Sequence, residues 1–176
     1  MHRKLLALAA GLGAAAVLAP AASAQVYGGA GYTLFTADAG GEDATVGGLM
    51  GRLGFKANPF FGVEGEVALG VQEDSFDVLG TNVDVSLENS YGVFAVGWLP
   101  VPAVGDVFAR VGYADMSIEA TATGIGAVSD SGSGMAYGAG VQLNFIPFTK
   151  IRLEYTRYEP EDSEVDSFGA SALFQF

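Results

Sequence analysis

The chain has 176 residues, with 20 acidic residues against 8 basic ones, one histidine and no cysteine, and its formal charge is −12. The length suits a single domain. The absence of cysteine excludes a disulfide framework and a thiolate metal site. A chain this acidic is also a poor partner for nucleic acid, because phosphates bind lysine and arginine.

The amino end has the layout of a cleaved secretory signal. A basic start is followed by an apolar run over residues 5–18 and by small residues up to Ala24, as in an n-region, an h-region and an A-x-A-like cleavage site. The apolar run is shorter than the roughly 20 residues that a membrane-anchoring helix needs. We therefore predict a signal peptide over residues 1–24, cleavage between Ala24 and Gln25, and a mature domain over residues 25–176.

The predicted mature chain is more acidic than the precursor and still hydrophobic. It loses Arg3, Lys4 and the single histidine, so 6 basic residues stand against 20 acidic ones and the formal charge becomes −14. No uninterrupted apolar stretch after residue 24 has the length of a membrane helix, since the nearest candidate, residues 91–105, contains Pro100 and Pro102. Two options are left: an unusually large soluble core, or a barrel in which every second residue faces lipid.

Alternation of apolar and polar residues predicts eight strands. In chain order they cover residues 25–37, 46–56, 60–72, a part of 83–99, 107–118, 135–145, 150–158 and 167–176. The connections alternate between long and short. The short ones, at residues 57–59, 99–102 and 146–149, contain proline, and the long ones, at 38–45, around 73–77, 121–133 and 159–166, are rich in glycine, serine or acidic residues. An outer-membrane barrel with short periplasmic turns and long outer loops requires this alternation.

Charged residues occupy the polar face of several predicted strands. The third strand has the clearest alternation, with apolar residues opposite Glu64 and Glu66. If Lys56 pairs with Phe60 across a three-residue turn, Arg52 lies directly opposite Glu64. We predict that lumen ion pairs are formed by Arg52, Glu64, Glu66, Arg110, Arg152 and Glu154.

The first strand has no clear facing. Tyr27 and Phe35 lie on one side, while Tyr32 and Leu34 lie on the other. Because both sides carry aromatic or aliphatic side chains, the pattern alone leaves open which side is internal.

Two other places break the alternation. Phe94, Val96 and Trp98 crowd the polar face of the fourth strand, which suggests a β-bulge that swaps the faces there. Met116 and Ile118 break the pattern of the fifth strand, and we interpret this as the point where the strand has left the membrane.

Aromatic residues help to separate a membrane barrel from a soluble one. A lipocalin-like barrel also has eight strands and could carry the ions outside and the apolar residues inside. One aromatic group clusters at the short-turn end (Phe55, Phe61, Phe145, Phe148, Phe174 and Phe176) and a second lies nearer the loop end (Tyr91, Tyr113, Tyr137, Tyr155 and Phe168). Two girdles fit two bilayer interfaces, so we predict an all-β protein, an eight-stranded antiparallel up-and-down transmembrane β-barrel.

Five segments then carry a family resemblance: QVYGGAGY at 25–32, FARVGYA at 108–114, YGAGVQLNF at 137–145, IRLEYTRYE at 151–159 and SALFQF at 171–176. In this order they resemble the small eight-stranded outer-membrane barrels of the OmpA/OmpX and opacity-porin type. The resemblance implies an outer-membrane location and contact with lipid and lipopolysaccharide. It also implies that the barrel-assembly machinery reads the last strand, at Ala172, Phe174 and Phe176. We expect a monomer without a cofactor.

Catalysis is not expected. Barrel enzymes that resemble this family use histidine as the base, and the mature chain has none, which excludes a Ser/His/acid arrangement. Glu64 and Glu66 could be read as a glycosidase pair, but we interpret them as lumenal carboxylates neutralised by arginines. No loop has the fixed spacing of a calcium motif.

Three functions are left open. A structural role in the envelope needs only the fold and is the preferred prediction. A narrow porin is the alternative, although eight strands enclose an interior just wide enough for side chains. Surface recognition is the third, by acidic loop residues that could bridge divalent cations to lipopolysaccharide or meet a basic partner: Asp38, Glu42, Asp43, Glu73, Asp74, Asp77, Glu161, Asp162 and Glu164.

Overall fold

A computed structural model of the chain describes residues 25–38, 43–72, 74–78, 81–122, 126–160 and 164–176. The strands are β1 (Gln25–Asp38), β2 (Asp43–Lys56), β3 (Phe61–Gln72), β4 (Asp74–Val78), β5 (Thr81–Val101), β6 (Gly105–Ala122), β7 (Gly126–Ile146), β8 (Thr149–Pro160) and β9 (Val165–Gln175). None of the described residues belongs to a helix long and apolar enough to cross a membrane. The predicted signal peptide lies outside the described residues and stays a prediction.

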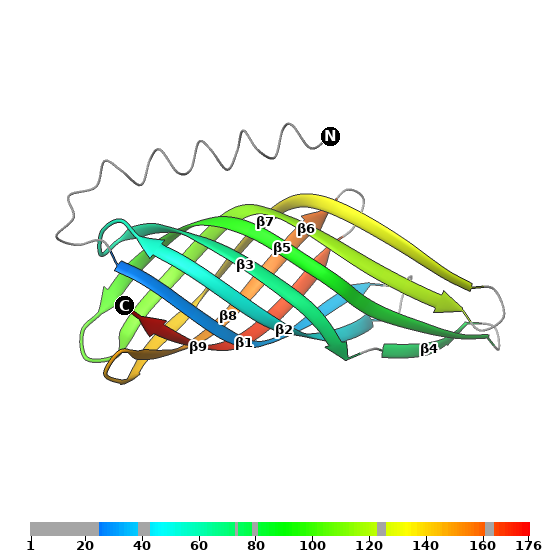
Figure 1. Cartoon of the computed structure of the whole chain (residues 1–176), viewed down its shortest axis with the longest axis horizontal. Helices are drawn as coiled ribbons and strands as arrows, with labels where there is room; N and C mark the ends of the chain where they lie inside the picture. The colour runs from blue at the N-terminus through cyan, green and yellow to red at the C-terminus, as the bar shows by residue number, and fades with distance from the viewer. Residues whose placement is uncertain (1–24, 39–42, 73, 79–80, 123–125, 161–163) are drawn as a thin grey trace.

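The strands form one closed antiparallel sheet (Figure 1). Apart from β3 and β4, strands that follow each other in the chain pair with each other. β1 pairs with β9 from Tyr27↔Gln175 to Ala37↔Val165. Both β3 and β4 pair with β5, so together they occupy one position in the barrel. The result is an eight-stranded up-and-down barrel, which confirms the predicted fold class.

The strands are longer at one end than the sequence indicated. The predicted loop over residues 121–133 is mostly strand, because β6 and β7 pair as far as Ala122↔Gly126. The acidic loop after residue 72 likewise contains β4. These predictions were wrong because a strand pair can extend by backbone hydrogen bonds alone, without alternating side chains. β5 and β7 reach 21 residues each, about twice the 9–11 that cross a bilayer, and with β6 they project beyond the other strands in Figure 1.

The two ends of the barrel therefore differ. The end with the connections at residues 57–60, 102–104 and 147–148 is the turn end, and the opposite one is the loop end. The start of β1 and the carboxyl terminus both lie at the turn end (Figure 1). This arrangement agrees with periplasmic turns and periplasmic termini.

The outer surface is apolar and the inner surface carries the charges. Leu53 and Phe61 are both 64% exposed on the outside, whereas Arg52 and Glu64 are buried inside. Of the predicted girdle residues, those exposed on the outside are Phe61, Phe148, Phe174 and Phe176 at the turn end and Tyr91, Tyr113, Tyr137 and Phe168 toward the loop end. Phe55 and Tyr155 are half-buried, and the side chain of Phe145 is not described.

The structure settles the facing of the first strand. Tyr27 and Phe35 are buried in the interior, while Tyr32 and Leu34 are exposed on the outside. The glycines between Tyr27 and Thr33 made the pattern unreadable, since they carry no side chain on either face.

The predicted bulge that swaps the faces exists in β5, but its position near Phe94 was wrong: Leu87 is buried inside, whereas Tyr91 is exposed on the outside. The register shift between β5 and β6 falls between Leu87 and Asn89, and Phe94, Val96 and Trp98 stay on the inner face. These large side chains fill the narrow lumen of an eight-stranded barrel, so apolar residues on the polar face did not mark the position of the swap. Met116 is buried for the same reason, and the side chain of Ile118 is not described.

The predicted register of the β2–β3 hairpin was also wrong. Lys56 pairs with Gly62, which brings Arg52 opposite Glu66 instead of Glu64. The turn is longer because the Asn58 carboxamide oxygen accepts hydrogen bonds from the backbone N–H groups of Phe60 (2.8 Å) and Phe61 (2.9 Å). A shift of two residues keeps every side chain on its predicted face.

An added side chain should be tolerated outside the barrel and not inside. A Cβ at Gly140 would lie 2.7 Å from Cζ of Phe108, whereas no atom lies within 4 Å of the Cβ position at Gly65 on the lipid face. We expect Gly140→Val to lower the unfolding free energy by about 1 to 3 kcal/mol through overpacking. The matched Gly65→Val change should cost less than about 1 kcal/mol. Urea unfolding in lipid vesicles measures both, and equal losses would contradict a filled interior at Gly140.

Candidate functional site

The candidate site is the interior of the barrel, which has three layers. The turn-end layer contains Tyr27, Lys56, Trp98, Asp106, Gln142, Lys150 and Leu173. The middle layer contains the six predicted ions, Arg52, Glu64, Glu66, Arg110, Arg152 and Glu154. The loop-end layer is apolar and contains Phe35, Val46, Met50, Leu87, Met116, Tyr158 and Val165.

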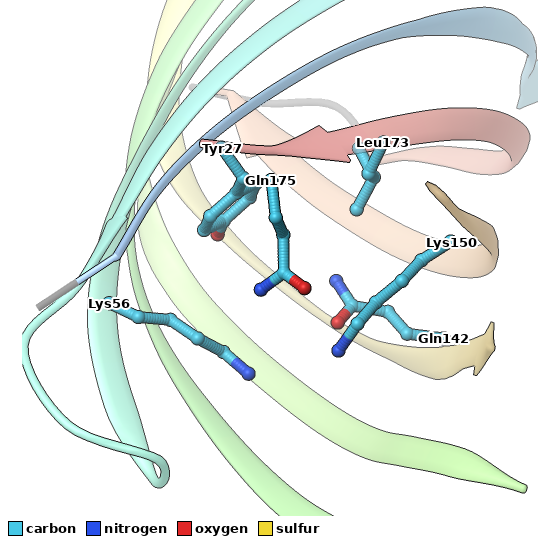
Figure 2. Close-up of a pocket in the computed structure, with 6 residues that line it drawn as sticks. All are labelled: Tyr27, Lys56, Gln142, Lys150, Leu173 and Gln175. Carbon is cyan, nitrogen blue, oxygen red and sulfur yellow. The ribbon is translucent and has the colours of Figure 1, made fainter. Parts of the chain in front are cut away.

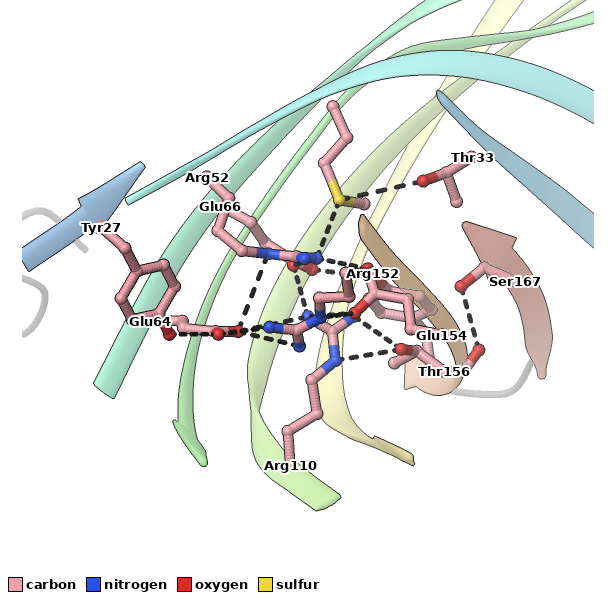
Figure 3. A network of polar contacts seen from close by, with 12 residues as sticks. Tyr27, Thr33, Arg52, Glu64, Glu66, Arg110, Arg152, Glu154, Thr156 and Ser167 are labelled. Carbon is pink, nitrogen blue, oxygen red and sulfur yellow. Dashed lines mark hydrogen bonds and ion pairs between the residues drawn. The ribbon is translucent and has the colours of Figure 1, made fainter. Parts of the chain in front are cut away.

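The middle layer is built around Arg152, whose side chain is fully buried (Figure 3). Its guanidinium donates to both carboxylate oxygens of Glu64, at 2.5 Å to Oε1 and 3.2 Å to Oε2. Its Nε donates to Oε2 of Glu154 at 2.8 Å. Planar arginine suits this two-pronged contact with a carboxylate.

The other two arginines complete the network. Arg52 Nη2 donates to Glu66 Oε2 at 3.0 Å and also to Glu154, while its Nε lies 3.7 Å from Glu64 Oε2. Arg110 Nη1 donates to Glu66 Oε2 at 2.5 Å, and Nη2 donates to the Thr156 hydroxyl at 2.6 Å. Every arginine therefore contacts at least two of the three glutamates, and the six side chains form one ion lattice.

The ion lattice is neutral and buried. Three formal positive charges meet three negative ones, and none of the six side chains is more than 5% exposed. Charges withdrawn from water in this way are tolerated only when they are paired and hydrogen-bonded. The strands bring together counter-charges from distant parts of the chain, such as Arg52 and Glu154. Nε and Nη1 of Arg52 are buried without a hydrogen-bond partner among the described residues.

Aromatic side chains line the lattice, and the sequence analysis missed them. The ring of Phe108 lies 3.7 Å from the Arg152 guanidinium, and that of Phe94 lies 4.2 Å from Arg110, both within the range of a cation–π contact. Phe108 could have been found, because it precedes Arg110 by two residues on the same strand face.

Two buried tyrosines add hydrogen bonds to the same carboxylates. The hydroxyl of Tyr27 donates to Glu64, and that of Tyr158 donates to Glu66 Oε1 at 3.0 Å. Neither tyrosine was predicted as part of the site. Tyr158 lies six residues after Arg152, so the period of two places it on the inner face.

The turn-end layer holds a second set of charges that the prediction did not include. Lys150 Nζ lies 2.7 Å from Asp106 Oδ2, and Lys56 Nζ lies 3.9 Å from the same oxygen. Lys56 also lies over the ring of Trp98, 4.4 Å from its centroid. With these two lysines, every basic residue after residue 24 except Arg157 is inside the barrel.

Arg157 lies on the loop-end half and is one-third exposed. Its Nε donates to Asp166 Oδ1 at 2.7 Å and its Nη2 donates to Oδ2 at 2.8 Å. It also lies 3.4 Å from Glu164 Oε2. This pair gives an exposed counterpart to the buried contacts of Arg152.

The predicted assembly residues lie on the outer face of the last strand. Phe174 is 49% exposed and Phe176 is 84% exposed, and Ala172 is partly exposed. The Phe176 backbone N–H donates to the Val26 carbonyl at 2.9 Å, which ties the carboxyl end to β1. The side chains are accessible from the membrane side.

Most of the acidic residues predicted for surface recognition cannot be placed. Glu42, Glu73, Glu161 and Asp162 lie outside the described residues, and the side chains of Asp38, Asp43, Asp74 and Asp77 are not described. Glu164 is exposed and paired with Arg157. Surface recognition by these residues stays a prediction.

Comparison with protein families assigns the barrel. The family described as "Outer membrane protein beta-barrel domain" matches residues 5–176. The chain belongs to this family. It is therefore an outer-membrane protein, as the family resemblance predicted, and the apolar outer surface is its lipid-facing surface. No curated protein sequence matches it.

Solved structures share the fold of this outer-membrane barrel. Ail, the attachment invasion locus protein of Yersinia pestis, is 20% identical with a TM-score of 0.66 and covers 88% of this chain and 99% of its own. Neisserial surface protein A is 13% identical, with a TM-score of 0.61 and coverages of 88% and 99%. The N-terminal barrel of Pseudomonas aeruginosa OprF is 16% identical, with a TM-score of 0.55 and coverages of 84% and 97%.

The lattice should behave as coupled charges and not as independent contacts. Glu64→Gln and Arg152→Met each leave a buried partner without its counter-ion, and each should lower the unfolding free energy by about 3 to 5 kcal/mol. The double variant should lose clearly less than the sum of the two. Arg52 with Glu64, 3.7 Å apart, should couple more weakly than Arg152 with Glu64.

The matched control is the exposed pair. Arg157→Gln and Asp166→Asn, alone and together, should give a coupling free energy of about 0 to 1 kcal/mol, because water and salt screen exposed charges. Urea unfolding of all variants in lipid vesicles gives both cycles. Additive losses at Glu64 and Arg152 would contradict the lattice.

Proposed function

We propose that this protein is a structural component of the outer membrane whose interior is closed to solutes. The observation that carries the proposal is the ion lattice of the middle layer, with its buried arginines and glutamates crossing the lumen from β2, β3, β6 and β8. A solute would have to separate buried arginines from the glutamates that neutralise them. This supports a barrel that seals instead of conducting.

Two further features support a closed interior. Phe94 and Phe108 occupy lumen space beside the lattice, and the apolar loop-end layer covers it from the other side. An eight-stranded barrel leaves room for little more than its own side chains. In this proposal Glu64 and Glu66 are structural counter-ions and not the acid and base of an enzyme.

The outer surface suits lipid on all sides. Closure of β1 onto β9 removes the free strand edges through which sheets associate. We propose that the barrel functions as a monomer surrounded by phospholipid and lipopolysaccharide. Sedimentation of the detergent-solubilised protein should give the mass of one chain, and a stable dimer would contradict this part of the proposal.

Planar-bilayer recording tests the closed interior. We expect the purified wild-type protein to give only rare, small openings, because the lattice and its aromatic neighbours obstruct the lumen. A known porin reconstituted in parallel controls for insertion. Stable, large unit conductance from this protein would reject the sealing role and favour the narrow-porin alternative.

We further propose that Phe176, with Phe174 and Ala172, is read by the outer-membrane barrel-assembly machinery. Phe176→Asp keeps the backbone hydrogen bond to Val26 and changes only the exposed side chain. It should reduce the folded barrel in cells several-fold while refolding into detergent changes little.

Phe148→Asp is the matched control, because Phe148 is equally accessible at 79% but lies outside the last strand. It should leave assembly in cells largely unchanged. Equal losses for Phe176→Asp in cells and in detergent would mean that the residue acts on stability alone.

A further inference from the structure

The turn-end mouth of the interior contains a small pocket of about 10 Å³, which has room for roughly one water molecule. It is lined by Tyr27, Lys56, Gln142, Lys150, Leu173 and Gln175. A larger group enters it only when the flexible lysine and glutamine side chains move outward. Figure 2 shows both lysine side chains and both glutamine amides extending into the same space from different strands. The pocket opens at the end of the barrel that carries the short turns, which in outer-membrane barrels is the periplasmic end.

The charges at this mouth do not cancel. Lys56 and Lys150 both approach a single carboxylate oxygen, Oδ2 of Asp106. The other carboxylate whose charge acts on Lys56 is Glu64, which belongs to the middle layer, where three glutamates already balance three arginines. Within the part of the chain that the structure describes, the mouth therefore keeps one excess positive charge.

This excess charge is poorly solvated. The side chain of Lys56 is 8% exposed and that of Lys150 is 16% exposed. A cation withdrawn from water to this extent is costly unless an anion accompanies it. The mouth thus favours an anion that enters from solution.

Hydrogen-bond donors are free to receive such an anion. Lys56 approaches Asp106 only to 3.9 Å, too far for a hydrogen bond, so among the described residues its three N–H donors are unused. Lys150 donates once, to Asp106. The indole N–H of Trp98, beneath Lys56, is buried without a partner among the described residues.

We propose that the turn-end mouth binds a small oxyanion, a phosphate or carboxylate group, between the ammonium groups of Lys56 and Lys150. The amide of Gln142, which is 2% exposed, supplies a further donor from the pocket wall. Asp106 opposes the anion and limits its affinity. The ligand reaches the site from the periplasmic side and needs no passage through the lattice, so the site is compatible with a closed lumen and independent of it.

The only tryptophan of the chain reports on this site. Trp98 is in contact with Lys56, so a bound oxyanion should alter its fluorescence. The wild-type protein in neutral, phosphate-free detergent is titrated with inorganic phosphate at constant ionic strength. We expect a saturable change in emission. The same change with sodium chloride alone would overturn the proposal.

Two variants, one that removes a positive charge from the mouth and one that removes the negative charge, make the test more specific. Lys150→Met should weaken the apparent affinity for phosphate about tenfold, whereas Asp106→Asn should strengthen it severalfold, because it removes the competing carboxylate. Arg157→Met, at the opposite end, is the control and should change nothing. If Lys150→Met does not fold, Asp106→Asn alone decides, since an unchanged or weaker affinity in that variant rejects the site.

The source of the oxyanion is tested separately. Short-chain phosphatidylglycerol carries the same phosphate chemistry as a lipid headgroup and is titrated in place of inorganic phosphate. A response to inorganic phosphate assigns the site to soluble oxyanions. A saturable response to the lipid alone, abolished by Lys150→Met, assigns it to a headgroup, and no response to either probe overturns the proposal.

Discussion

Within a bilayer, every backbone N–H and C=O group has to find a partner in the protein itself. The pairing of β1 with β9 meets this constraint by closing the sheet, and most other features of the barrel depend on that closure. A closed sheet of eight strands has a narrow interior. Side chains on the inner faces of different strands therefore contact one another. Charged side chains on these faces need counter-charges from other strands.

The ion lattice is the response to that confinement. Its arginines can contact two or three carboxylates each, because the guanidinium offers five donors in one plane. Phe94 and Phe108 face two of the guanidinium groups, so Arg110 and Arg152 also make cation–π contacts. Such a lattice adds little stability relative to an apolar core. Removal of a single charged side chain is nevertheless strongly destabilising, because its partner stays buried without a counter-charge.

The two ends of the interior are chemically different. Apolar side chains such as Phe35 and Met116 cover the lattice on the loop side, whereas lysines and amides lie on the turn side. The first barrel strand starts and the last one ends at the turn end, where the Phe176 backbone N–H donates a hydrogen bond to the Val26 carbonyl. The proposed oxyanion site therefore lies at the turn-end mouth. The long strands β5, β6 and β7 extend the barrel at the loop end.

The sequence by itself determined the number of barrel strands, the inner and outer face of most of them, and the six charges of the lattice, because a period of two residues is a local property. It failed where the answer depended on another strand. The pairing of Arg52 with Glu66 followed from the Asn58 turn, the inner position of Phe94 from the space in the lumen, and the extra length of β6 and β7 from their mutual hydrogen bonds. The contact between Arg52 and Glu154 joins residues 102 positions apart, and only closure of the barrel decides it.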